Sequence, residues 1–299
     1  MKATLIITCH NQNKFLEQLL CMLNLNPGVD NLLPEIIIVD SSDKPIAEAK
    51  GAKNYRIPNY GPSYARNFGA SKATGEWLIF CDADDMVNPM VFKSIEQLDT
   101  AGFDAVFFNW KKEEDSIFAS VANNFFKDLE FPSRFSFETL NDPLFFIGTF
   151  YPVHSLLLKR SLMDLVKFKE DQWFIEDVRF YIELALIPGV RLGKCTSKEL
   201  TSFHRYFKNK SSLSTSNEEK FWEGVCNNYN YLYEYASLSF KQKITLSKLL
   251  LLSYHSVAPS VQLIIENKCE RIWNSFGGLG KFLKNKSLFK FATGITRAV

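Results

Sequence analysis

One short stretch, Trp77 to Pro89, constrains the fold of this chain more than any other. Its first five residues, Trp77-Leu-Ile-Phe-Cys81, are apolar and have the length of a strand buried on both faces, too short for a helix. Three aspartates follow within four residues, and the pair Asn88-Pro89 then favours a turn that leads into a helix. Because open α/β sheets bind ligands outside the carboxyl ends of their strands, this acidic turn marks a candidate site.

The three acids of the turn are Asp82, Asp84 and Asp85. Neighbouring carboxylates repel one another unless a cation holds them, and hard divalent ions prefer oxygen ligands. We therefore predict an Asp-X-Asp clamp that holds Mg²⁺ or Mn²⁺ against a diphosphate. An acidic turn that is only solvated is the alternative, and three acids alone do not exclude it.

Apolar runs of strand length alternate with helical patterns through the first part of the chain. Strands are expected at 3–8, 35–39, 56–57, 77–81 and 105–110, and helices at 15–23 and 63–71. Strands that alternate with helices form right-handed βαβ units. We therefore predict an α/β fold with a Rossmann-like, mostly parallel central sheet and flanking helices.

The later part of the chain changes character near residue 216. Residues 111–152 give no firm elements, and beyond them strands are expected at 154–159, 190–192 and 200–204 and helices at 161–166 and 176–186. A helical apolar stripe then covers 221–236, further helices are expected at 244–252 and 261–273, and 216–219 and 239–242 fit capping boxes. We predict a catalytic domain over residues 1–215 and a C-terminal helical region over 216–299.

Two earlier predicted strands also end in polar residues, in the same way that the strand at 77–81 ends in aspartates. The first strand delivers Thr8, His10 and Asn11, and the second delivers Asp40. If the three strands are neighbours, these groups converge on one crevice that suits a nucleotide, with the carboxylate accepting from a pyrimidine N–H or a ribose hydroxyl. Alone, Asp40 followed by two serines is also good turn chemistry.

Composition excludes several classes of protein. A net charge of +2 gives no reason to expect a nucleic-acid partner. The six cysteines are scattered without a Cys-X-X-Cys pair, which is typical of reduced thiols in a cytosolic protein and not of a disulfide frame or zinc site. We expect no signal peptide and no membrane-spanning helix.

Five segments together resemble the family-2 glycosyltransferases of the GT-A fold. They are Thr8-Cys-His-Asn11, Val39-Asp40, Ala65-Arg-Asn-Phe-Gly69, Gly75-Glu-Trp-Leu-Ile-Phe80 and Asp82-Ala-Asp-Asp85. Their order and spacing match the family over about residues 3 to 90. The chain departs from it at Thr8-Cys9, where many members have proline, and at Ser41, where many have a second aspartate.

The resemblance implies a nucleotide-sugar donor, usually a UDP-sugar, and Mn²⁺ or Mg²⁺ bound through the Asp-X-Asp motif. It places Asp40 at the base, Asp82 at the ribose or the metal, and Asp84 at the metal. The other donor-binding positions that it implies are Thr8, His10, Asn11, Arg66, Asn67 and Ala83.

A second segment, Phe168-Lys-Glu-Asp-Gln-Trp-Phe-Ile-Glu-Asp177, resembles the acceptor side of the same family, which ends in Glu-Asp at a helix start. Asp177 then matches the general base, with Glu176 beside it. An inverting transfer needs one carboxylate to take the proton of the acceptor hydroxyl, and a helix start keeps an aspartate ionised. The alternative is that both acids only complement the helix dipole.

A third segment, residues 204–214, is similar to a family loop that closes over the donor. His204 is expected to reach the metal, and Arg205, Lys208 and Lys210 the diphosphate; a solvated basic loop is the alternative. His154, between apolar residues, is interpreted as a packed core histidine.

We predict an inverting, metal-dependent glycosyltransferase, hexosyl or N-acetylhexosaminyl, that modifies a glycan or lipid-linked glycan in cell-surface polysaccharide synthesis. A nucleotidyltransferase is an alternative, although Cys9-His-Asn-Gln-Asn13 lacks the glycines of its usual loop. A catalytically inactive nucleotide-sugar-binding scaffold is another. We expect a cytoplasmic protein, and the lysine-rich tail over 279–299 suits either an anionic membrane surface at the inner face of the cell membrane or packing within the chain or a homo-oligomer.

Overall fold

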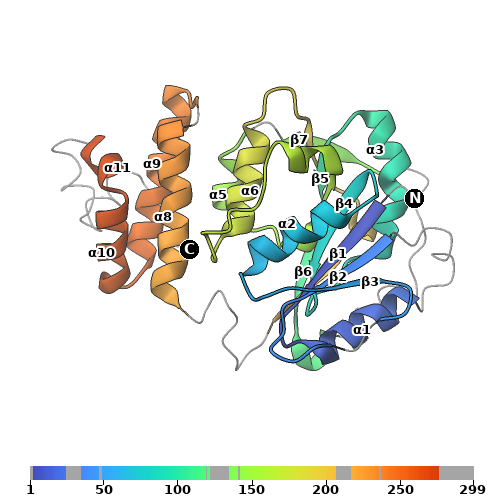
Figure 1. Ribbon diagram of the computed structural model, residues 1–299. Coiled ribbons are helices and arrows are strands. Elements are labelled where there is room, and N and C mark those ends of the chain that lie inside the picture. The colour runs from blue at the N-terminus through green and yellow to red at the C-terminus, as the bar shows by residue number, and fades with distance from the viewer. Residues whose placement is uncertain are drawn as a thin grey trace. The chain divides into compact units, whose positions relative to one another are not determined.

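The computed structural model describes residues 3–24, 35–46, 49–118, 120–121, 135–140, 142–206, 217–235 and 237–275 (Figure 1). The chain forms two compact units. The first comprises residues 1–142, 151–173 and 183–210, and the second comprises 143–150, 174–182 and 211–299. The second unit thus takes in two short segments from earlier in the chain. The predicted boundary at residues 215 and 216 lies outside the described residues and stays a prediction.

The first unit contains an eight-stranded sheet (Figure 1). Across the sheet the strands are β3 (Lys53–Arg56), β2 (Glu35–Asp40), β1 (Ala3–Cys9), β4 (Trp77–Asp82), β8 (Leu156–Lys159), β5 (Ala105–Phe107), β9 (Leu192–Cys195) and β7 (Phe137–Leu140). The first four are parallel to one another, β8 is antiparallel to both β4 and β5, and β7 is antiparallel to β9. The predicted α/β fold with a mostly parallel sheet is confirmed.

The central strands are buried because helices cover the sheet. Every residue of β1 is buried, and Trp77 to Cys81 of β4 are too, as their unbroken apolar runs predict. Helices α1 (Asn13–Asn24), α2 (Pro62–Lys72) and α3 (Ile95–Ala101) follow β1, β3 and β4 along the chain. Gly69 lets α2 lie close to the sheet, since a Cβ there would be 2.4 Å from Cγ2 of Ile6.

A second, two-stranded parallel sheet pairs β6 (Trp110–Glu114) with β10 (Ser202–Tyr206). The strand predicted over 105–110 is therefore wrong in part: β5 ends at Phe107, and the N–H of Phe108 donates to the carbonyl of Ser155. The strand predicted over 200–204 starts later, because a 3-10 turn occupies Lys198–Leu200.

Several other boundaries differ from the sequence patterns. A 3-10 turn over Val153–Ser155 replaces the start of the strand predicted at 154–159, and a 3-10 helix over Arg160–Asp164 stands near the helix predicted at 161–166. The helix predicted over 261–273 is two helices, α10 (Pro259–Lys268) and α11 (Glu270–Ser275), which break at Cys269.

The second unit is helical. It holds α5 (Phe145–Gly148), most of α6 (Glu176–Ala185), α8 (Glu218–Tyr235), α9 (Phe240–Ser256), α10 and α11. The side chain and backbone of Ser239 exchange hydrogen bonds with Gln242, so the capping box predicted for α9 is confirmed. The other predicted box includes Ser216, outside the described residues. No helix within the described ranges is both long and apolar enough to cross a membrane.

Candidate active site

The carboxyl ends of β1, β2 and β4 meet at one edge of the sheet. Thr8 is the register partner of Asp82 on β4, and Cys9 is the partner of Asp40 on β2. The polar groups that follow these three strands are therefore neighbours, as the sequence predicts. The individual roles assigned to them stay predictions.

Asp82 is held by two partners from its own surroundings. The hydroxyl of Thr8 donates to Oδ1 at 2.6 Å, and Nη2 of Arg66 lies 3.0 and 3.1 Å from the two carboxylate oxygens. Arg66 is buried on α2, with its guanidinium 5.3 Å from the ring centre of Phe168. Arg66 thus contacts the acidic turn directly.

Asp84 stands between Asp82 and Asp85 in the acidic turn. Burial, together with the negative charges of Asp85 and Asp82, raises its pKa to about 7. No ion pair is formed by Asp84 among the described residues. A divalent cation would favour its ionised form, so the oxygen donors here fit Mn²⁺ or Mg²⁺.

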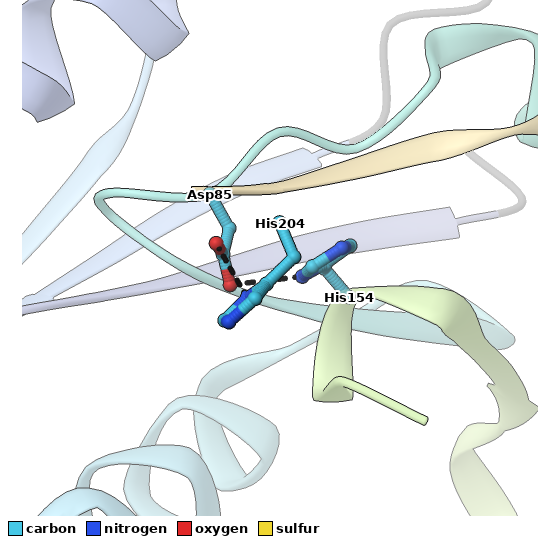
Figure 2. A group of neighbouring side chains, drawn as sticks. All are labelled: Asp85, His154 and His204. Carbon is cyan, nitrogen blue, oxygen red and sulfur yellow. Dashed lines mark hydrogen bonds and ion pairs between the residues drawn. The ribbon is translucent and has the colours of Figure 1, made fainter. Parts of the chain in front are cut away.

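Asp85 lies between two histidines (Figure 2). Nδ1 of His154 is 3.0 Å from Oδ2, and Nδ1 of His204 is 3.0 Å from Oδ1, which also accepts the backbone N–H of Arg205 at 3.0 Å. Burial alone would raise the pKa of Asp85, but His154 and His204 outweigh it and the pKa is lowered. An ionised Asp85 can only accept, so Nδ1 of the fully buried His154 is the donor.

Long-range backbone pairing brings these residues together. Met86, just after the acids, exchanges two backbone hydrogen bonds with Phe203 of β10, at 2.9 and 2.8 Å. Nδ2 of Asn88 donates to the carbonyls of Glu199 and Thr201. The acidic turn is thus joined to β10, and this places Asp85 beside His204.

Only one of the residues predicted to hold the metal belongs to the cluster of possible metal ligands that the structure shows. Within the described part of the chain, one group of three His, Cys, Asp or Glu side chains has ligand atoms within 4.8 Å of one another, namely Asp85, His154 and His204. Of the predicted ligands Asp82, Asp84 and His204, only His204 is in it. Burial lowers the pKa of His204, but the negative charges of Asp85, Asp84 and Asp82 outweigh burial, so that the pKa is raised. No sequence pattern indicates that His154 joins Asp85, because the apolar neighbours of His154 predict only burial.

The loops after β1 and β2 are bound to each other. Asn11 has a φ of 58°, its N–H donates to Oγ of Ser42 at 2.8 Å, and its amide group exchanges hydrogen bonds with Asp43. Nδ1 of the exposed His10 lies 2.8 Å from the carbonyl of Ser41. Both predicted donor-binding residues of this loop, His10 and Asn11, therefore lie at the surface.

Asp40 makes the contacts of a turn-forming residue. Its carboxylate accepts the N–H groups of Ser42 at 2.8 Å and Ile46 at 3.2 Å, and Nη1 of Arg56 is 3.1 Å away. The side chain is buried. The alternative that the sequence left open is thus realised, and contact with a nucleotide base stays a prediction.

Asn67 and Ala83, two further predicted donor-binding residues, have protein partners. The amide of Asn67 donates to the carbonyl of Phe168 and to Glu170, both at 2.9 Å, and accepts the N–H of Phe168 at 3.1 Å. Ala83 is fully buried, and its N–H donates to the carbonyl of Thr8 at 2.9 Å. Asn67 therefore holds the start of the predicted acceptor segment.

Arg205 is buried, and its guanidinium is surrounded by protein. Nε donates to the carbonyl of Asp84 at 2.8 Å, Nη1 to Asp115 at 2.6 Å and Nη2 to Gln18 at 3.0 Å. The ring centres of Phe15 and Phe118 lie 4.4 and 4.0 Å from its guanidinium carbon. These contacts give Arg205 a structural part in holding the acidic turn, and its predicted contact with the diphosphate stays a prediction. Lys208 and Lys210 lie outside the described residues.

Glu176 and Asp177 form the first turn of α6, as predicted. Oδ1 of Asp177 accepts the N–H of Val178 at 2.8 Å, and Glu176 is buried. Both belong to the second unit. Their assignment as general base and its neighbour stays a prediction.

A mostly parallel sheet with an acidic turn after a central strand is the arrangement of the GT-A glycosyltransferases, and the comparisons agree. A family model described as glycosyl transferase family 2 matches residues 4–166, more than half of the chain. The chain belongs to this family. No curated protein sequence matches it.

Solved structures of S. aureus TarS share the fold. The fragment TarS 1–349 is 17% identical, with a TM-score of 0.63 over 99% of this chain and 92% of that chain. Its complex with UDP-GlcNAc is 17% identical, with a TM-score of 0.64 over 98% and 92%. Its complex with UDP is 16% identical, with a TM-score of 0.60 over 99% and 92%. The predicted GT-A fold with C-terminal helices is confirmed.

Proposed function

We propose that the protein transfers a sugar, with inversion, from a UDP-sugar to a hydroxyl of a glycan or glycolipid. The observation that carries this proposal is the contact of Asp82 with Thr8 at the carboxyl edge of the sheet, with Asp84 two residues further on, in a chain of glycosyl transferase family 2. The likeness to a structure that contains UDP-GlcNAc supports a nucleotide-sugar donor, of the hexosyl or N-acetylhexosaminyl kind.

The metal in this proposal is Mn²⁺ or Mg²⁺, held by Asp84 and Asp82 with His204. The crowding that raises the pKa of Asp84 supports a cation at this place. When bound, the ion neutralises negative charge on the diphosphate leaving group. Thr8 and Arg66 fix the carboxylate of Asp82, and His10, Asn11 and Asp40 stand at the nucleotide side.

Asp177 is the general base of the proposed reaction. It takes the proton of the acceptor hydroxyl while that oxygen forms a bond to C1 of the sugar and the bond from C1 to the diphosphate breaks. Attack from the opposite face inverts C1, so no enzyme nucleophile is needed. The N-terminal turn of α6 favours the ionised form of Asp177.

The acceptor in this proposal is a growing cell-surface glycan, free or lipid-linked, reached from the cytoplasm at the inner face of the membrane. In this proposal the tail over 279–299, which suits an anionic membrane surface or packing within the chain or a homo-oligomer, contacts the membrane; it lies outside the described residues. A homo-oligomer through the C-terminal helices belongs to the same proposal.

A thermal-shift panel tests the donor class. Purified protein would be mixed with UDP-, GDP-, CDP- and dTDP-sugars, each with and without Mn²⁺. A ligand that binds only the native state raises the melting temperature, so a UDP-sugar with Mn²⁺ should give the largest rise. Asp84→Asn is the matched control and should lose the part of the rise that depends on Mn²⁺.

The same samples separate the alternatives. A glycosyltransferase releases UDP from its donor slowly even with water as acceptor, whereas a nucleotidyltransferase releases pyrophosphate from a nucleoside triphosphate and a sugar phosphate. Protein that neither binds nor cleaves any nucleotide sugar would be a scaffold, and the proposal would be rejected.

A further inference from the structure

The backbone just before Glu176 and Asp177 has an uncommon conformation. Ile175 has a φ of 57°, in the left-handed region that branched side chains rarely adopt. Such a conformation is strained and persists only where the surroundings enforce it. Something must therefore hold this turn, and the holding residues come from the same compact unit.

Asn228 of α8 holds the carbonyl of Ile175. Its Nδ2 donates to that oxygen at 3.2 Å from a side chain that is only 1% exposed. The N–H of Arg179 donates to the same oxygen, also at 3.2 Å, as the first hydrogen bond at the start of α6. Because one oxygen receives donors from both helices, the direction of the peptide that leads into Glu176 is fixed.

Gly224 lies one helical turn before Asn228 and allows the close approach. A Cβ at Gly224 would lie 2.5 Å from the carbonyl oxygen of Phe174 and 3.3 Å from the carbonyl carbon. Any side chain at this position would therefore force the backbone to shift. Glycine inside a helix is less favourable than alanine. At this position it lets α8 lie directly against the peptide that precedes Ile175.

A third contact completes the face of α8. Tyr231 lies seven residues after Gly224, on the same side of the helix, and its ring centre is 3.3 Å from the guanidinium carbon of Arg179 on α6. Gly224 thus lies against the peptide of Phe174, and Asn228 binds the carbonyl of the strained Ile175. Tyr231 contacts Arg179 in the first turns of α6. We call this set the α8 clamp.

We propose that the α8 clamp positions Asp177 for proton transfer, so that the C-terminal helices are part of the catalytic apparatus. This inference rests on the proposed function, in which Asp177 is the general base. Gly224 and Asn228 are positioning residues, since they act on the backbone that presents Asp177. Displacement of a reacting group by about 1 Å can lower a rate about 100-fold, and a clamp on rigid helices prevents it.

Two neighbouring asparagines allow a matched test. Asn228→Asp keeps the shape of the side chain and removes the donor, whereas Asn227→Asp makes the same change at an exposed position of the same helix. The probe is UDP-GlcNAc with Mn²⁺, with the release of UDP as the rate and the binding of UDP measured separately by calorimetry. Asn228→Asp should lower the rate on the order of 10- to 100-fold and leave UDP affinity within about twofold. Asn227→Asp should change neither.

The substitution Ile175→Gly provides the rescue. Because glycine adopts a positive φ without strain, Ile175→Gly added to Asn228→Asp should restore much of the rate. A purely structural role of Asn228 would lower rate, UDP binding and melting temperature together, and that result overturns the inference. An unchanged rate in Asn228→Asp also overturns it.

Hydrogen exchange tests the clamp without any substrate. In Asn228→Asp the amides of residues 174–182 should exchange faster, while those of β1 and β4 and those of Asn227→Asp should not. Unchanged exchange contradicts the clamp even in an active enzyme. Faster exchange in a protein that cleaves no nucleotide sugar would reject the proposed function alone and leave the clamp standing as a structural finding.

Discussion

The guanidinium of Arg66 lies 3.0 and 3.1 Å from the two carboxylate oxygens of Asp82. Arginine is always charged, so Asp82 has a permanent cationic partner within the protein. Asp84 forms no ion pair among the described residues, and its pKa is raised to about 7. A divalent cation therefore gains more from Asp84 than from Asp82.

Isosteric amides at these two positions should behave differently. Asp84→Asn should weaken Mn²⁺ binding more than Asp82→Asn, as measured by electron paramagnetic resonance of free Mn²⁺ in the presence of UDP. Without metal at pH 8, Asp84→Asn should raise the melting temperature because it removes a crowded charge, whereas Asp82→Asn should lower it because the buried Arg66 loses its partner. Equal effects of the two variants on Mn²⁺ binding would contradict this distinction.

The raised pKa of Asp84 also predicts a pH dependence. A cation must displace a proton from Asp84 below pH 7 and none above it. Mn²⁺ affinity should therefore fall by up to about tenfold per pH unit below 7 and level off between pH 7.5 and 8.5. Calorimetric titration of Mn²⁺ alone at pH 6, 7 and 8 checks this, with Asp84→Asn as the control that should lose the part of the dependence that comes from Asp84.

His154 should support Mn²⁺ binding through Asp85 although it is fully buried. One carboxylate oxygen of Asp85 contacts Nδ1 of His154 and the other contacts Nδ1 of His204 (Figure 2). Because Nδ1 of His204 faces the carboxylate, its Nε2 points away from it. Loss of such outer partners typically lowers metal affinity about 10- to 100-fold. We expect that loss in His154→Leu, and near-normal affinity in His154→Asn, whose amide keeps a donor near Nδ1.

The same two His154 variants also test a second arrangement, in which His154 and His204 bind the ion directly. If purified wild-type protein retained one metal ion without nucleotide, and both His154 variants lost it, the histidines would bind the ion themselves. Equal affinity in wild type and His154→Leu would show instead that His154 only fills space.

The parts of the fold that the sequence predicted are those set by local pattern. The run from Trp77 to Cys81 is apolar throughout, so its burial as a central strand and the position of the acids at its end follow from adjacent residues alone. The start of α6 at Glu176 and the capping box at Ser239 are local in the same sense.

What the sequence could not predict depends on distant partners. The pairing of Met86 with Phe203 leaves no local pattern, yet it decides that Asp85 meets His204. The sequence shows the charge of Arg205 but not the aromatic rings and Asp115 that surround its guanidinium. Likewise, the positive φ of Ile175 depends on α8, which begins more than 40 residues later in the chain.

Asp177→Asn should separate chemistry from binding. The amide keeps the size of the side chain and cannot accept a proton, so transfer should fall by at least about 100-fold while Mn²⁺-dependent binding of UDP stays unchanged. Release of UDP from UDP-GlcNAc and calorimetric binding of UDP measure the two quantities on one preparation. Full transfer by this variant would remove Asp177 from the mechanism.

Glu35, at the start of β2, should make stability fall in acid. Its burial would raise the pKa, but Lys53, the hydroxyl of Thr4 at 2.6 Å and the N–H of Thr74 at 2.7 Å outweigh burial and lower the pKa to about 2. A carboxyl group whose pKa is lower in the folded state stabilises the fold above its unfolded value of about 4.5, and this contribution is lost as pH falls toward 2. Since Lys53 is half exposed, solvent screening reduces the effect to about 1–2 kcal/mol.

The variant Glu35→Gln isolates this contribution from that of the other acids. Urea unfolding of both proteins at pH 3, 5 and 7 should show wild type more stable at pH 5 and 7, with the difference shrinking by about 1–2 kcal/mol at pH 3. The Thr4 and Thr74 donors can still bond the amide oxygen, so the variant should remain folded. A difference that is the same at all three pH values would mean that the charge of Glu35 contributes nothing to the stability of the sheet, and that Glu35 acts through its hydrogen bonds to Thr4 and Thr74 alone.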